Sequence, residues 1–174
     1  MRIIGFAMAM CLGLAAAAAE AAGPTDPQIA AIVVTANQVD IDAGNLAAKK
    51  SHTKDVRDFA QRMITDHTGV NKSAVDLVTK LKVTPEDNST SQSLKAGGEE
   101  NLKSLKTLNG AAFDKAYVDH EVAYHEQVLD AVDKVLIPNA TNAELKALLV
   151  QVRPAFVAHL EHAKRIQASL AAKT

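Results

Sequence analysis

Apolar residues recur every three or four positions along most of the chain, which is the spacing of one buried face of an α-helix. The pattern predicts helices over about residues 27–50, 53–81, 91–108, 111–136 and 142–170. The third helix is the weakest, because Gly97 and Gly98 lie inside it. Pro154 falls near the middle of the last helix and is expected to kink or break it. No segment alternates apolar and polar residues as a half-buried strand does.

The segments between these helices are short and rich in turn-forming residues. KVTPEDNST (82–90) is the clearest loop, and IPNATN (137–142) is expected to stop the fourth helix. Thr53 is a candidate N-cap for the second helix, and Thr141 or Asn142 is a candidate for the last one.

Long amphipathic helices joined by short loops bury their apolar faces best against one another. We therefore expect one all-α domain over residues 27–171, folded as an up-and-down four-helix bundle with an additional shorter helix. The shorter third helix either joins the bundle or lies across its end. The composition agrees with a bundle, because 48% of the residues are hydrophobic but only 3% are aromatic.

Charge and motifs exclude several classes of function. The chain has 19 basic and 20 acidic side chains, and the basic ones are scattered, which argues against binding to a nucleic acid or an anionic membrane. The sequence contains no Gly-x-Ser-x-Gly elbow, phosphate-binding glycine loop or dinucleotide fingerprint. The missing reaction motifs favour a non-enzymatic protein.

Residues 1–21 have the features of a secretory signal peptide. Arg2 precedes an apolar run and an alanine tract, and Ala19-Glu20-Ala21 is a cleavage signal. A membrane anchor is the alternative for this segment. We expect a periplasmic protein without stable membrane insertion after cleavage. The only cysteine lies inside the segment, so disulfides, thiolate catalysis and sulfur-ligated metals are excluded for the mature chain.

Three histidines fall on the buried faces of three different helices. His125 occupies one position of the stripe that Val118, Val122 and Leu129 also mark, and His67 and His159 lie within the stripes of their own helices. Carboxylates fall near the same faces. The candidate metal-ligating residues are His67, His125, His159, Glu121, Asp40 and Asp114.

These buried polar groups are open to two interpretations. A buried polar side chain without a partner costs on the order of 1–3 kcal/mol, so the groups must satisfy one another or bind water or a metal. Neutral imidazoles that converge with carboxylates form a usual ligand set for one divalent transition metal, here Zn, Fe or Mn. Alternatively, the histidines are hydrogen-bonded core residues of a non-enzymatic envelope or stress-related module.

The chain resembles the exported bacterial proteins grouped as domain of unknown function 4142 (DUF4142), often labelled outer-membrane or membrane proteins. The resemblance covers about residues 27–170. It is carried by Asp40 in NQVDIDAGNLAAKK, where the family usually has Glu, by Phe59, Met63, Asp66 and His67 in VRDFAQRMITDH, by Phe113, Asp114 and Tyr117 in FDKAY, by His125 in YHE, and by Pro154 and His159 in RPAFVAHL. The family's recurring histidines fall on His67, His125 and His159.

The resemblance implies a ferritin-like fold and a periplasmic protein without an established activity. Ferritin-like di-iron proteins use two Glu-x-x-His motifs, and this sequence contains none. A histidine-rich mononuclear site therefore fits the chain better than a carboxylate-bridged pair of irons. Candidate partners are an envelope protein or a second copy of the chain.

Overall fold

The computed structural model describes residues 23–172 and is all-α, with no strand among them. The predicted signal peptide lies outside the described residues. The helices are α1 (Asp26–Lys50), α2 (Lys54–Leu81), α3 (Ser89–Thr107), α4 (Gly110–Ala131), the π-helical segment η1 (Val132–Leu136), α5 (Ile137–Asn139) and α6 (Ala143–Ala171). None of the helices in this part of the chain combines the length and apolarity that a membrane span needs.

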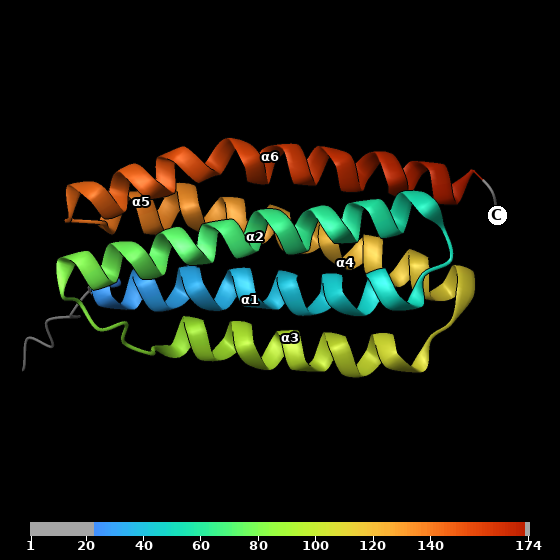
Figure 1. Ribbon diagram of the computed structural model, residues 1–174, viewed down its shortest axis with the longest axis horizontal. Coiled ribbons are helices and arrows are strands. Elements are labelled where there is room, and N and C mark those ends of the chain that lie inside the picture. Colours follow the sequence, from blue (N-terminus) through green and yellow to red (C-terminus); the bar gives the residue numbers. More distant parts are fainter. Residues whose placement is uncertain (1–22, 173–174) are drawn as a thin grey trace, which may run out of the picture.

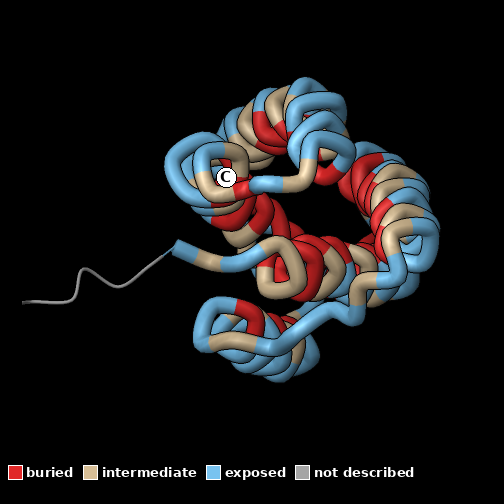
Figure 2. Tube along the Cα trace, turned by 90° about the vertical axis from the view of Figure 1, so that its left-hand side faces the viewer, coloured by how far each residue is buried: buried red, intermediate tan, exposed pale blue. Residues whose placement is uncertain are grey.

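Four long helices, α1, α2, α4 and α6, lie side by side and surround a common interior (Figures 1 and 2). Neighbours in this arrangement run antiparallel, and α1 packs most extensively against α2, as α4 does against α6. The shorter α3 lies lengthwise along the outer side of α1. It neither joins the bundle nor lies across its end, because it carries the chain back along the whole bundle so that α4 starts at the same end as α2 (Figure 1).

Gly98 explains how α3 packs closely on α1. A Cβ atom at this position would lie 2.7 Å from Cγ2 of Val39, which is too close for any side chain. The two glycines that weaken the helical pattern therefore differ in role, since a Cβ atom at Gly97 would meet nothing within 4 Å. Asn88 starts α3, because its side chain accepts hydrogen bonds from the backbone N–H groups of Thr90 and Ser91.

Capping side chains fix the ends of the bundle helices. Asn142 caps α6, one of the two predicted candidates. The carboxylate of Asp26, in the first turn of α1, accepts hydrogen bonds from the backbone N–H groups of Thr141 and Asn142 and so joins the starts of α1 and α6. Thr53 stands at the N-cap position of α2, but its hydroxyl donates to Asp114 instead of capping the helix.

Two prolines lie where a helix was expected to stop, kink or break. The segment 137–142 does stop the fourth helix, but at Asn139 rather than at residue 136, because the helix continues through η1 and α5. Pro138 has no N–H group, and its ring would press on the Lys134 carbonyl in a regular α-helix, a clash that the wider π turn before it relieves. Pro154 was expected to kink or break the last helix, and it does not break it, since α6 is continuous from Ala143 to Ala171. Figure 1 shows α6 bowed along its length.

The apolar core forms two separate clusters, one in each half of the bundle. One cluster includes Phe59, Phe113 and Ile166, and the other includes Ile29, Leu136 and Leu149. Each bundle helix contributes to both clusters. Near the middle of each helix, between the residues that belong to one apolar cluster and those that belong to the other, lie buried polar side chains. These side chains form the candidate site.

Candidate metal centre

A layer of buried polar side chains, hereafter the polar layer, crosses the bundle between the two apolar clusters. All four bundle helices contribute to it: Asn37 and Asp40 from α1, His67 from α2, Glu121 and His125 from α4, and His159 from α6. None of these residues is more than 3% exposed. Charged and polar groups buried to this degree must be compensated within the layer itself.

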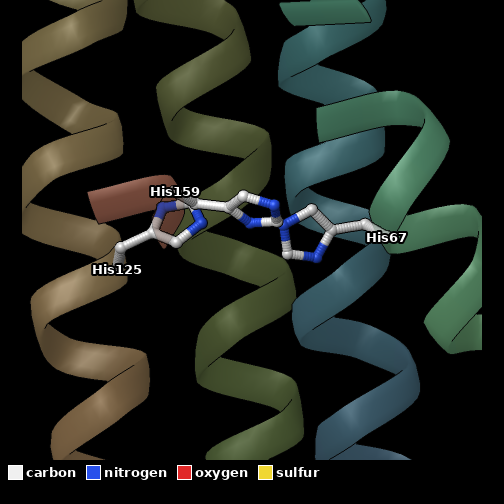
Figure 3. Close-up of side chains that lie close together, drawn as sticks. All are labelled: His67, His125 and His159. Atoms are coloured by element: carbon white, nitrogen blue, oxygen red, sulfur yellow. The ribbon is translucent and has the colours of Figure 1, made fainter. Parts of the chain in front are cut away.

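The three predicted histidines meet at the centre of the polar layer (Figure 3). Their ring centroids are 5.7 Å apart for His67 and His125, 5.2 Å for His67 and His159, and 5.5 Å for His125 and His159. One nitrogen from each ring lies within 4.8 Å of the other two. A tetrahedral zinc ion with ligands at about 2.0–2.1 Å places its nitrogens roughly 3.4 Å apart, so each ring would move inward by less than about 1 Å.

Hydrogen bonds on the outer side fix which nitrogen of His67 carries its proton. Nδ1 of His67 lies 2.6 Å from Oδ1 of Asn37, and the amide nitrogen of Asn37 donates to the Val33 carbonyl at 2.7 Å. Because the Asn37 oxygen can only accept, Nδ1 is the donor. The neutral ring then has an unprotonated Nε2, which has no hydrogen-bond partner among the described residues.

The other two histidines follow the same rule. Nδ1 of His125 donates to the Glu121 backbone carbonyl at 2.9 Å, and Nε2 of His159 donates to the Asp66 carboxylate at 2.8 Å. Nε2 of His125 and Nδ1 of His159 are buried and lack a hydrogen-bond partner in the described part of the chain. A metal-bound histidine in proteins usually donates its second N–H to a carbonyl or carboxylate in this way.

The three imidazoles are neutral at neutral pH, as metal ligands must be. Burial, together with repulsion from the other two rings, lowers the pKa of His67 to about 2. Burial likewise lowers the pKa of His125 to about 4 and lowers the pKa of His159. Partial burial acts to raise the pKa of Asp66, but hydrogen bonds from His159 and Arg62 hold it below its usual value, so Asp66 is an ionised acceptor.

Two carboxyl groups, Asp40 and Glu121, lie beside the histidines. Burial raises the pKa of Asp40 to about 8, and burial together with the neighbouring Asp40 raises the pKa of Glu121 well above its usual value. Oδ2 of Asp40 lies 3.6 Å from Nε2 of His67. In a metal-loaded site these groups can ionise and balance the charge of the ion, which three neutral imidazoles cannot do.

Asp40, Glu121 and His125 also form a second group with ligand atoms within 4.8 Å of one another. The His125 nitrogen that lies 3.6 Å from the Glu121 carboxylate is Nδ1, and its proton is donated to the Glu121 carbonyl. Nδ1 of His125 is therefore not free to bind a metal, whereas each histidine of the triad has one ring nitrogen without a hydrogen-bond partner among the described residues. The geometry favours the three histidines as the primary ligands.

Asp114 is buried, as expected, but it does not join the other candidates. It lies seven residues before Glu121 on α4, which is roughly 10 Å along the helix axis. Oδ2 of Asp114 instead accepts the hydroxyl hydrogen of Thr53 at the start of α2. Helical periodicity placed Asp114 on the correct face of α4, but the seven-residue spacing already put it two turns from Glu121 along the axis.

The remaining histidines take no part in the triad. His120 is half-buried and stacks on Tyr124, and His162 lies edge-on to Phe59. His52 is exposed, as expected for a residue between two helices. The hydroxyl of Tyr124 donates to the Ala36 carbonyl rather than to the histidines.

Sequence reasoning missed Asn37 and Asp66 as members of the site. Asn37 is a polar residue between Val33 and Asp40 on the buried face of α1, so its position on that face was a usable signal. Asp66 appeared only among the residues that carry the family resemblance; it is partly exposed and its partner His159 is 93 residues away, so helical periodicity does not assign it to the site.

Comparison with known families matches residues 12–166 to the family described as Domain of unknown function (DUF4142). The chain belongs to the DUF4142 family. The matched range contains every residue of the polar layer, so the resemblance inferred from the histidine-bearing segments is confirmed. No curated protein and no solved structure matches this DUF4142 chain. Membership in DUF4142 carries no activity with it, so function has to be argued from the site.

Proposed function

We propose that this protein is an exported, ferritin-like helical-bundle protein that holds one divalent transition-metal ion with His67, His125 and His159. The observation that carries the proposal is the orientation of the three rings. Each imidazole donates one N–H group to a protein oxygen and keeps one buried, unprotonated nitrogen without a hydrogen-bond partner among the described residues, and the three rings lie against one another. Three neutral nitrogen ligands leave one position of a tetrahedral ion open, and zinc is the ion that this ligand set suits best, with iron and manganese as further candidates.

A purely structural role accounts less well for the same arrangement. Histidines that serve only as hydrogen-bonded core residues would be expected to satisfy both ring nitrogens, because each unpaired buried polar group costs about 1–3 kcal/mol. Here three such nitrogens converge on one point. A bound ion satisfies all three at once. The proposal includes no reaction, and export rests on the sequence of residues 1–21 alone.

Metal content tests the proposal directly. The untagged protein, purified without chelators, should contain close to one equivalent of a transition metal, or take up one equivalent of Zn²⁺ or Co²⁺ on titration. Tetrahedral Co²⁺ would give visible absorption bands of characteristic intensity. Less than about a tenth of an equivalent, with no uptake on titration, would exclude a site of the expected affinity.

Matched variants locate the ion. Replacing His67, His125 or His159 with Gln should each lower the affinity by at least about a hundredfold, since a three-ligand site that loses one ligand keeps little of its binding energy. His52→Gln, at an exposed histidine outside the site, should leave the affinity unchanged. Helix content measured by circular dichroism separates loss of metal from loss of fold. Equal effects of His52→Gln and the three site variants would contradict the assignment.

A further inference from the structure

A cavity of about 210 Å³ lies next to the polar layer, on the side of the apolar cluster that contains Leu136 and Leu149. Its walls come from six elements, and most of the lining side chains are apolar, among them Ile32, Val132 and Phe156. A dry apolar cavity of about 150 Å³ is large enough to bind one benzene molecule. The cavity in this protein therefore has room for one ring or short branched chain with a substituent.

The cavity extends from the surface to the polar layer. Thr90 of α3 and Gln127 of α4 line it and are exposed, so they mark the side on which it opens. At the inner end its wall includes Asn37, Asp40 and His67. The contents of the cavity therefore meet apolar side chains over most of their surface and polar side chains at one end only.

The polar end of the cavity accepts a hydrogen bond. The His67 ring is held by stacking on Phe156, with centroids 5.3 Å apart and an interplanar angle of 11°, and by the bond from Nδ1 to Asn37. Nε2 of His67 therefore carries a lone pair of fixed direction and has no hydrogen-bond partner among residues 23–172. This nitrogen lies 3.6 Å from Oδ2 of Asp40. An O–H group is the complement of this lone pair, because a hydroxyl donates to the nitrogen and can also bond to a neighbouring carboxyl.

We propose that this cavity binds one small, uncharged, mainly apolar molecule with a hydroxyl group, such as an alcohol or a phenol, with the hydroxyl against His67 and Asp40. A charged molecule is disfavoured, since it would be buried among aliphatic side chains. The inference concerns the metal-free protein, because an ion bound to Nε2 of His67 would take the lone pair to which the hydroxyl donates. It does not require the metal site to be occupied.

Titration of the protein with phenol and with toluene tests the proposal. Because metal-free protein is used, the outcome is independent of whether the metal site exists. The two probes have the same number of non-hydrogen atoms and differ by a hydroxyl or a methyl group. Methyl and imidazole NMR signals of residues that line the cavity should shift and saturate with both. His67→Phe keeps an aromatic ring against Phe156 but removes the lone pair. It should weaken phenol binding by roughly fivefold or more and leave toluene binding within about twofold.

A pair of alanine variants tests whether the cavity is the place of binding. Ala131→Leu adds a side chain to the lining and should weaken both probes by about tenfold or more, because the added atoms occupy the volume that the probe needs. Ala123→Leu, at an exposed position of the same helix outside the lining, should change neither affinity. The proposal is overturned if neither probe gives saturable shifts, if His67→Phe affects both probes equally, or if the two alanine variants behave alike.

Discussion

Asp40 gives the sharpest test of the polar layer, because burial displaces its ionisation far from that of the unfolded chain. In the folded protein its pKa is raised to about 8, compared with 3.8 for an unperturbed aspartate. The unfolded chain therefore loses this proton above pH 4, whereas the folded protein keeps it up to about pH 8. Between these values folding must take up a proton, so the free energy of unfolding of the metal-free protein falls by about 1.4 kcal/mol per pH unit from this group.

Asp40→Asn removes this dependence because the amide is neutral at every pH and has nearly the same shape. The free energy of unfolding of the variant relative to the wild type should rise by about 4 kcal/mol between pH 5 and pH 8. The reason is that the wild type loses stability over these three pH units as folding must take up a proton at Asp40. Titrating groups away from Asp40 are common to both proteins and cancel in the difference, whereas Glu121 titrates together with Asp40, so the difference belongs to the pair. This stability difference is measured by urea unfolding of both metal-free proteins at several pH values, with circular dichroism as the signal.

Asp58→Asn is the matched control, because Asp58 is exposed and pairs with Lys54 on the same helix. Its stability difference from the wild type should be small and the same at pH 5 and pH 8. A constant difference for Asp40→Asn across this range would refute the reasoning. So would a variant that loses stability relative to the wild type as the pH rises.

Two further changes have defined outcomes. Gly98→Ala should destabilise the protein by about 1–3 kcal/mol, because its Cβ atom would press on Val39. Gly97→Ala, whose Cβ atom meets no neighbour, should stabilise α3 by about 0.5–1 kcal/mol. Similar thermal unfolding midpoints for the two variants would contradict the close packing of α3 on α1. Asp66→Asn should lower metal affinity by about tenfold or more, measured by competition with a chelator, because it removes the charge that makes His159 a more basic ligand. An unchanged affinity in this variant would show that the hydrogen bond does not tune the site.

Much of the architecture could be predicted because the residues buried on one face of a helix recur every three or four positions in the sequence. Val118, Val122 and His125 are all buried, as their spacing on one face of α4 indicated. The same reasoning could not place residues along the bundle axis, because height depends on where each helix starts and on how the loops connect. Asp114 is a different case, since its distance of two turns from Glu121 on the same helix follows from the sequence and was not used.

The site was predictable only to the extent that its members share buried faces. His67 and His159 were found because each is a polar residue in an apolar stripe, and the fold brings them to the same height. The hydrogen bonds that orient the rings could not be found in this way. The acceptors for His67 and His159, an amide and a partly exposed carboxylate, lie on other helices, so the packing of separate helices decides them. The acceptor for His125 is a backbone carbonyl one turn earlier on its own helix.

The position of the polar layer has a consequence for the alignment of the bundle. Aliphatic faces rich in alanine, valine and leucine pack almost equally well after one helix slides along another by a turn, about 5.4 Å. Such a slide here would place an imidazole or a carboxyl group among the side chains of an apolar cluster and separate it from its hydrogen-bond partner, which is costly. The side chains proposed to hold an ion therefore also select one axial register of the four helices, in the way that a single buried asparagine does in a coiled coil.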